Sequence, residues 1–236
     1  MLLVIESGMN WLKKILSACW QLPLKLKSNV ALERVLFLKT AVSVSETSGV
    51  TISGATMIND RISISGDGNV LKAVGCKITN TRIIIEGRNC RLLLREGTVI
   101  NNSEIVLRGT GCIIEIGKGT TVGSGELVCM GVDNSLTIGE GCMIADNVDV
   151  WATDSHPIMD RDSRMVLNLS SPIAIADHVW IGKGASVLKG VKIGRDSVVG
   201  MKSLVTHDIE PYSLYAGVPA KKIKEYVTWN RNFIEQ

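Results

Sequence analysis

Aromatic side chains and histidine are both scarce in this chain. Aromatic residues make up only 4% of the 236 residues, and histidine occurs three times. Small and β-branched side chains must therefore build most of the interior, for which 45% of apolar residues is ample. The length alone leaves open one large domain or two small ones.

The sequence also lacks closely paired cysteines. A zinc knuckle or a thioredoxin-like site would need a C-x-x-C pair. We interpret the cysteines as reduced thiols that serve as small apolar residues in a cytoplasmic protein, and we expect no metal. The six cysteines are Cys19, Cys76, Cys90, Cys112, Cys129 and Cys142.

Excess charge of either sign is absent as well. The net charge is +3, and no basic run alternates with aromatic residues. Nucleic acid is therefore not expected as a partner. Charged residues, at 21%, are ordinary for a folded protein.

The N-terminal stretch 10–26, "NWLKKILSACWQLPLKL", has apolar residues spaced as on one face of a helix. It is too short and too charged to span a bilayer, and it lacks the features of a signal peptide. We favour a cap packed over one end of the core. The alternative is weak contact with anionic lipid through the flanking lysines, which would place the protein at the inner face of the membrane.

One apolar position recurs every six residues in the C-terminal third. An α-helix puts residues i and i+6 on different faces, whereas a period of six keeps side chains on one side of short strands. The pattern therefore predicts an all-β solenoid made of hexapeptide faces and turns. The position is held by Ile175, Ile181, Val187, Ile193, Val199 and Val205.

The same period recurs upstream and slips twice. It is held by Ile52, Ile58, Ile64 and Val70, then by Ile116, Val122 and Val128, then by Ile138, Ile144 and Val150. The long slip before Ile175 predicts an extruded loop near residues 152–172, and loops on a rigid scaffold often carry function.

We divide the chain into an N-terminal cap or extension (1–50), a solenoid of roughly eight coils (51–210) and a C-terminal loop and helix (211–236). The helix is predicted from Lys221, because Ile223, Tyr226 and Val227 would share one side.

The repeats "IGKGAS", "IGRDSV" and "VGMKSL" resemble those of the hexapeptide-repeat acyltransferases. Over about residues 135–224, "DSHPIMD", "DHVWIG" and "GVPAK" follow in the order typical of bacterial O-acetyltransferases of capsule, polysialic acid and lipopolysaccharide. The resemblance implies a left-handed parallel β-helix, usually a homotrimer. It also implies acetyl-CoA as the acetyl donor, bound between subunits, and a carbohydrate acceptor.

The resemblance further implies that a loop histidine acts as general base, which here is His156. A sugar hydroxyl is a poor nucleophile near neutral pH, and an imidazole has a suitable pKa to remove its proton. We expect Asp154 or Asp160 to hold the imidazole in the right tautomer. Asp160 is also a candidate for binding the acceptor.

Trp180 matches a tryptophan that lies beside the acetyl group in related enzymes. Its neighbours Val179 and Ile181 are one place away along a strand, so its indole should point outward. His178 shares that face and could line the acceptor site. Packing between subunits is the alternative for both residues.

The resemblance also suggests the residues that bind the donor. "GMKSLVTH" departs from the family string, because Met201 replaces a small residue and His207 a common lysine. Lys202 could supply the missing charge, and the lysine pair after "GVPA" could bind the nucleotide phosphates. The candidates are Gly184, Ala185, Gly200, Lys202, Ser203, Thr206, His207, Lys221 and Lys222.

Other functions share this solenoid. One is an N-acyltransferase acting on a nucleotide-linked amino sugar, and another is a serine or antibiotic O-acetyltransferase. A zinc enzyme like the γ-class carbonic anhydrases would need His156, His178 and His207 to converge, although none lie close in sequence. The last alternative is a non-catalytic scaffold.

Overall fold

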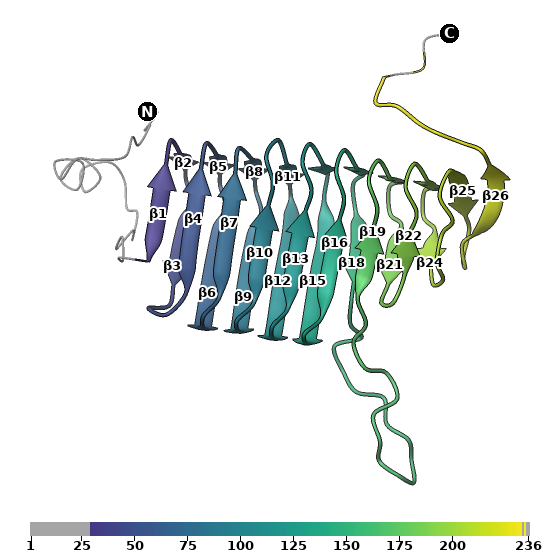
Figure 1. The fold of residues 1–236 in the computed structure, drawn as a ribbon, viewed down its shortest axis with the longest axis horizontal. Helices are drawn as coiled ribbons and strands as arrows, with labels where there is room; N and C mark the ends of the chain where they lie inside the picture. Colours follow the sequence, from purple (N-terminus) through teal and green to yellow (C-terminus); the bar gives the residue numbers. More distant parts are fainter. Residues whose placement is uncertain (1–28, 233, 235–236) are drawn as a thin grey trace, which may run out of the picture.

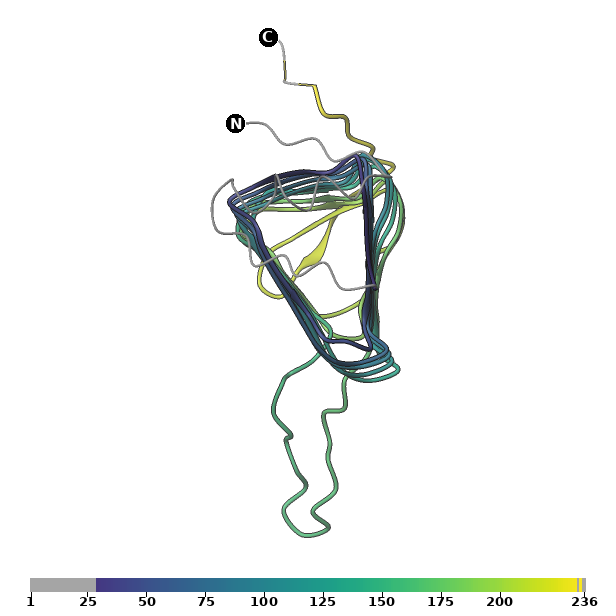
Figure 2. The same cartoon turned by 90° about the vertical axis from the view of Figure 1, so that its left-hand side faces the viewer.

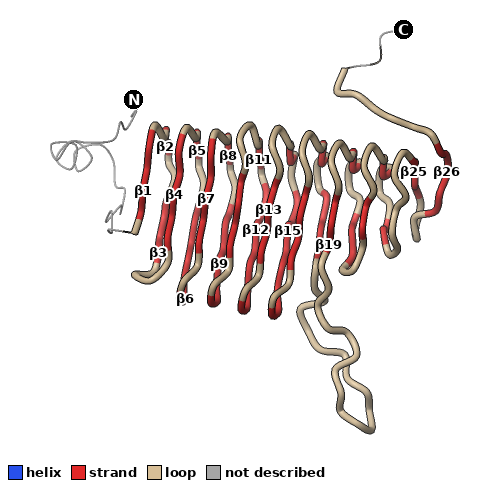
Figure 3. The backbone as a smooth tube through the Cα atoms, in the orientation of Figure 1, coloured by secondary structure: helices blue, strands red, loops and turns tan. Residues whose placement is uncertain are grey.

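The computed structural model describes residues 29–232 and 234, and these residues coil into a three-sided prism (Figures 1 and 2). The predicted amphipathic stretch 10–26 and Cys19 lie outside the described residues. No helix occurs in residues 29–232, which consist of strands and loops (Figure 3). In this part of the chain, nothing therefore forms a helix that could cross a bilayer.

Three sheets form the sides of the prism. The first sheet contains β1 (Val30–Glu33), β4 (Gly49–Ser53), β7 (Val70–Val74), β10 (Arg91–Leu94), β13 (Ile113–Ile116), β16 (Ser135–Ile138), β19 (Ile173–Ile175) and β22 (Lys192–Ile193). The second contains β2 (Leu36–Leu38), β5 (Thr56–Ile58), β8 (Lys77–Thr79), β11 (Val99–Asn101), β14 (Thr121–Val122), β17 (Met143–Ile144), β20 (Trp180–Ile181), β23 (Val198–Val199), β25 (Ser213–Ala216) and β26 (Lys221–Glu225). The third contains β3 (Ala41–Val44), β6 (Arg61–Asp67), β9 (Arg82–Arg88), β12 (Ser103–Thr110), β15 (Gly125–Val132), β18 (Val148–Trp151), β21 (Ser186–Leu188) and β24 (Leu204–Val205).

Each coil contributes one strand to each sheet, and neighbouring coils pair in parallel. The first sheet counts eight coils, as predicted. Viewed from the N-terminal end, the chain turns anticlockwise as it recedes, so the coil is left-handed (Figures 1 and 2). The expectation from the family resemblance is thus confirmed.

A single apolar core fills the prism from one end to the other. In the C-terminal third, all six residues of the predicted hexapeptide position are buried, because they point inward from short strands. The five cysteines among the described residues are free and buried, which agrees with their predicted role as small apolar residues.

The early coils do not keep the period of six. Val50 pairs with Leu71 and Ile114 with Leu136, whereas Ala174 pairs with Lys192 after 18 residues. Early coils are therefore three or four residues longer than late ones. Two predicted core positions are wrong for this reason: Ile58 and Val70 are half-buried, and the adjacent Met57 and Leu71 fill the core instead.

The solenoid also starts earlier than the boundary at residue 51. Its first strand, β1, pairs with β4 in full register, from Val30 with Val50 to Glu33 with Ser53. This first coil was missed because its strands alternate apolar and polar residues without a hexapeptide period.

The predicted C-terminal helix is wrong. Residues Lys221–Glu225 form β26, which pairs antiparallel with β25. The end strand of a sheet presents unpaired backbone groups, and β26 satisfies those of β25. The side that would have been the apolar face of a helix stays in solvent: Ile223 is 63% and Tyr226 94% exposed.

A row of glycines bends the long strands of the third sheet. Gly66, Gly87, Gly109 and Gly131 pair with one another in successive coils. A Cβ atom on Gly109 would lie 1.9 Å from the carbonyl oxygen of Gly131. Only glycine permits this close stacking, and the φ of Gly109, +121°, also favours glycine.

The extruded segment lies where the sequence predicts it. β18 ends at Trp151 and β19 begins at Ile173, and residues 152–172, here called the arm, project from the corner between the third and first sheets (Figures 1 and 2). Met159 and Val166 form an isolated antiparallel bridge within the arm.

Candidate active site

The base of the arm is fixed by three polar side chains. Lys189, on the coil below, donates to the Asp154 carboxylate at 2.5 Å and to the Asn168 carbonyl at 2.8 Å. The Asn168 amide donates to Asp154 at 2.8 Å and to the His156 carbonyl at 3.0 Å. These bonds join the two strands of the arm to each other and to the prism.

His156 lies just beyond this base. Its backbone N–H donates to the Asp154 carbonyl at 2.7 Å, so its main chain is held on both sides. The side chain is exposed. Within the described residues, no hydrogen bond or ion pair engages the imidazole, which is therefore available to a group from outside this protomer.

The structure does not give Asp154 or Asp160 the predicted contact with the imidazole. Lys189 first, and then Asn168, hold the pKa of Asp154 below its ordinary value, and both bond to its carboxylate. Asp160 accepts from the backbone and hydroxyl of Ser163 and from the backbone of Asp162. Asp154 therefore anchors the arm, and Asp160 caps the turn at its tip.

Trp180 points outward from β20 and is 37% exposed, as predicted. His178, at the preceding corner, is half-buried, and its Nδ1 lies 2.7 Å from a carboxylate oxygen of Asp196. Partial burial acts to raise the pKa of Asp196, but hydrogen bonds from His178 and Thr228 lower it overall. Trp229 stacks on His178 with ring centroids 4.4 Å apart.

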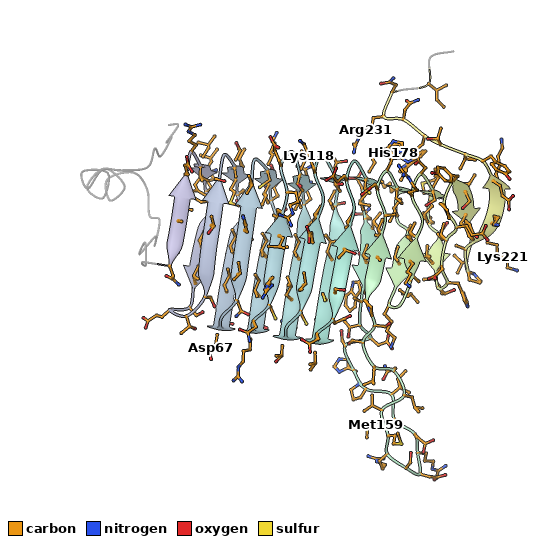
Figure 4. The ribbon with its side chains drawn as sticks, in the orientation of Figure 1. Asp67, Lys118, Met159, His178, Lys221 and Arg231 are labelled. Carbon is orange, nitrogen blue, oxygen red and sulfur yellow. The ribbon has the colours of Figure 1, made fainter. Side chains whose placement is uncertain are left out.

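The prism separates His156 from Trp180 within one chain. The arm leaves the corner between the third and first sheets, and Trp180 belongs to the second sheet, on the opposite side (Figure 2). Figure 4 shows the same separation between Met159 of the arm and His178. Two hollows on the first sheet, of about 760 and 470 Å³, are lined by neither His156 nor Trp180.

Three of the predicted donor-binding residues have structural surroundings. Ala185 is fully buried, and the buried Ser203 hydroxyl accepts from the Gly217 N–H at 3.1 Å. A Cβ atom on Gly200 would lie 2.7 Å from the Ala216 Cβ, so this glycine allows the next coil to stack. These side chains face the coil rather than a ligand.

The other predicted donor-binding residues lie on the surface. Lys202, His207 and Lys221 are exposed, and Gly184 and Thr206 are half-buried. The Thr206 hydroxyl lies 2.8 Å from the His207 Nδ1. Lys222 binds Glu210 at 2.5 Å and Glu225 at 2.8 Å, and both carboxylates raise its pKa. Lys221, at the far end of the prism (Figure 4), has no ion pair among residues 29–232.

The three histidines have separate environments. His156 is on the arm, His178 bonds Asp196, and His207 contacts Thr206. No group of three or more histidine, cysteine or acidic side chains among the described residues is arranged to hold a metal ion. The geometry of a γ-carbonic-anhydrase site is therefore absent from a single protomer.

Several residues around the candidate site carried no recognisable signal in the sequence. Lys189 and Asn168 are single polar residues, and only the fold brings them to the base of the arm. Trp229 and Arg231 follow the segment that the sequence assigned to a helix. A tryptophan and an arginine beyond the last repeat were the available signal.

The fold and these motifs agree with known proteins. Residues 172–207 match the family described as bacterial transferase hexapeptide (six repeats). The polySia-specific acetyltransferase NeuO has a similar structure, with a TM-score of 0.61 and 27% identity over 87% of this chain and 91% of that one. This chain has the hexapeptide-repeat fold of the bacterial acetyltransferases.

Two curated relatives match shorter segments. A polysialic acid O-acetyltransferase of Escherichia coli O1:K1 / APEC is 37% identical over 90 residues, which is 38% of this chain and 29% of the relative. A chloramphenicol acetyltransferase of Klebsiella aerogenes is 54% identical over 54 residues, or 23% of this chain and 26% of the relative. The chain thus spans less than a third of these two relatives, and both are named acetyltransferases.

Proposed function

We propose that this protein transfers an acetyl group from acetyl-CoA to a sugar hydroxyl of a bacterial surface polysaccharide or its precursor. The main support is the position of His156. Its backbone is anchored through Asn168 to a rigid coil, while its imidazole is exposed and unengaged within residues 29–232. The E. coli relative named for polysialic acid favours a glycan as acceptor.

In this mechanism, His156 takes the proton of the acceptor hydroxyl as the oxygen attacks the acetyl carbonyl carbon. A new C–O bond forms, and the C–S bond of the thioester breaks once the tetrahedral intermediate collapses. The thiolate leaves and accepts the proton from the imidazolium. The Trp180 indole N–H is the donor that we assign to an oxygen of the reacting group. Asp154 positions the arm and takes no part in the proton transfer.

The exposed cations near the end of the prism suit the phosphates of the donor. Lys221 has no ion pair among the described residues, whereas Lys222 is held by two glutamates. We assign the phosphate contacts to Lys221 and Lys202. Lys222 is the matched control, because its charge is already neutralised.

The site is assembled between chains of a homotrimer. His156 and Trp180 lie on opposite sides of one prism, so a histidine from one protomer must meet a tryptophan from the next. The arm also carries apolar side chains that a neighbour would cover. These include Ile158 (59% exposed), Met165 (68%), Leu167 (64%) and Leu169 (72%).

The first test measures thiol release from acetyl-CoA with a panel of bacterial glycans. His156→Ala should lower the rate by about 10²–10⁴-fold, the usual contribution of a general base. Arg161→Ala, an exposed change on the same arm, should leave the rate unchanged. If His156→Ala keeps the full rate while sedimentation shows an unaltered oligomer, the base assignment is wrong.

The second test mixes two inactive variants. Protomers carrying His156→Ala and protomers carrying Trp180→Ala are co-expressed and purified together. A site shared between neighbours should regain about a quarter of the wild-type rate by random pairing in a cyclic trimer. A mixture as inactive as its two parents would contradict the shared site.

A small-molecule hydroxyl is the second candidate acceptor. The K. aerogenes relative is named for chloramphenicol, and its segment has the higher identity of the two relatives. Chloramphenicol therefore belongs in the acceptor panel. Turnover with chloramphenicol and with no glycan would replace the polysaccharide proposal.

A further inference from the structure

The C-terminal residues 226–232, here called the strap, run back along the prism after β26 (Figure 1). They follow the corner between the first and second sheets. The Val227 N–H donates to the Tyr212 carbonyl at 2.9 Å, and the Thr228 hydroxyl to Asp196 at 3.1 Å. The strap thus bonds to successive coils in order.

Trp229 and Arg231 continue the same path. The Trp229 Nε1–H donates to the His178 carbonyl at 2.8 Å. The Arg231 guanidinium donates to the Cys142 carbonyl at 2.7 Å and to the Thr121 hydroxyl at 2.9 Å. Arg231 and His178 lie near each other at this corner in Figure 4. The strap therefore fastens coils that are far apart in sequence.

The corner beneath the strap has an unusual backbone composition. One residue per coil has a left-handed φ there, and in five consecutive coils this residue is a glycine: Gly54, Gly75, Gly97, Gly119 and Gly141. In the three coils under residues 227–229 it is His178 (φ 54°), Asp196 (φ 56°) and Tyr212 (φ 57°). Each of these non-glycine residues costs on the order of 1 kcal/mol in backbone strain.

Side chains or carbonyls of those three residues make the contacts with the strap. Trp229 stacks on His178 with the ring planes 7° apart, and it is only 8% exposed. Its indole lies 6.1 Å from that of Trp180, at an angle of 48°. Trp229 is therefore a wall behind the residue to which we assign the acetyl group.

We propose that the strap, through Trp229, fixes the orientation of the Trp180 indole, and that Trp229 is a positioning residue for the transfer reaction. The consequence for turnover rests on the proposed function, whereas the orientation of Trp180 does not. Without Trp229, the partly exposed Trp180 loses the aromatic neighbour that limits its rotamers. An N–H donor that is no longer held in place stabilises a developing oxyanion less well.

The test labels the protein with 5-fluorotryptophan and assigns the Trp180 fluorine resonance by its loss in Trp180→Phe. Trp229→Ala should shift and broaden this resonance. Trp229→Phe keeps a ring on His178 and should restore a single sharp signal. Tyr226→Ala removes a 94% exposed aromatic side chain from the same strap and should change nothing. An unchanged Trp180 resonance in Trp229→Ala would overturn the proposal.

Kinetics provide the second readout. Trp229→Ala should lower kcat roughly tenfold while the KM for acetyl-CoA stays within about twofold, the pattern of misplacement rather than lost binding. In a Trp180→Phe background, Trp229→Ala should cause no further loss. Multiplicative losses would show that Trp229 acts elsewhere and would refute the positioning role. If wild-type protein transfers no acetyl group, the proposed function fails, and the fluorine spectra still decide the orientation of Trp180.

Discussion

The early and late coils of this prism are built differently. Early coils take 21 or 22 residues, as from Val50 to Leu71, and carry long strands on the third sheet, such as β12 and β15 with eight residues each. Late coils take 18 residues, and most of their strands have only two or three residues.

The candidate functional residues belong to the late part. The arm, Trp180 and the surface under the strap all occur at or after the last early coil. A short coil leaves little freedom at its corners, so a side chain there has a well-defined direction. The early coils lengthen the same core and bury the larger share of isoleucine and leucine. The comparison indicates that length is used for stability and tight turns for placement.

The largest predicted effect concerns the glycine row, which only the long early strands possess. Gly109→Val should destabilise the fold by roughly 4 kcal/mol or more, because its side chain would collide with the Gly131 backbone. In a late coil, Gly184→Ala should cost about 1 kcal/mol, for its left-handed φ alone. Urea unfolding followed by circular dichroism measures both variants.

Gly54→Ala is the control within the early coils. This glycine has a φ of 59°, and an added Cβ would meet nothing closer than 3.7 Å. Its cost should match that of Gly184→Ala. Equal losses for Gly109→Val and Gly54→Ala would show that close stacking of the glycine row does not matter.

The second prediction concerns a buried carboxyl at an early corner. Asp60 is 3% exposed, and burial raises its pKa to about 6 although the Thr81 N–H donates to it at 2.8 Å. Ala185 and Ser203 occupy the matching place, just before β21 and β24, in two late coils.

The sign of the pH dependence follows from this raised pKa. As the pH rises from about 4 to about 6, unfolded Asp60 has lost its proton while folded Asp60 retains it, so the free energy of unfolding falls by about 2 kcal/mol and then levels off. Asp60→Asn should remove this decrease, and it should be more stable than wild type at pH 8 but not at pH 4. Urea unfolding at both pH values measures the difference, and parallel pH profiles would contradict the prediction.

The smallest effect is expected in a ladder of exposed asparagines. Asn80 accepts from Asn59 at 2.8 Å and donates to Asn102 at 3.1 Å, and its φ is 52°. Asn80→Ala should cost about 1–2 kcal/mol, since it loses both bonds and keeps the strained φ. Asn80→Gly relieves the φ and should cost less. Thermal unfolding would rank the two, and a reversed order would show that the bonds contribute nothing.

Much of the prism could be predicted because its side chains repeat. Ile175 to Val205 hold the six-residue period, and the slip after Val150 located the arm to the residue. Ile58 and Val70 were misplaced because longer coils insert residues at the corners, and corner residues leave no periodic signal. The helix prediction at Lys221 was wrong because the open edge of β25 pairs with residues 221–225 and draws them into the sheet.

The candidate site was harder to predict, since it depends on contacts between distant residues. His156 and Trp180 could be singled out from local motifs. The partners of Asp154, and the packing of Trp229 on His178, join residues separated by 35 and 51 positions in the chain. No local pattern encodes such a pair, because only the number of coils between two residues brings them together.

The arm enters the coil without disturbing it. Ile138 pairs with Ile175, and Val150 with Val187, in the same register that adjoining coils use elsewhere. A corner that tolerates an insertion of this size could accept others of different length and sequence. Replacing that excursion would then alter which acceptors are recognised without redesigning the scaffold, so one spiral frame could serve a whole series of enzymes.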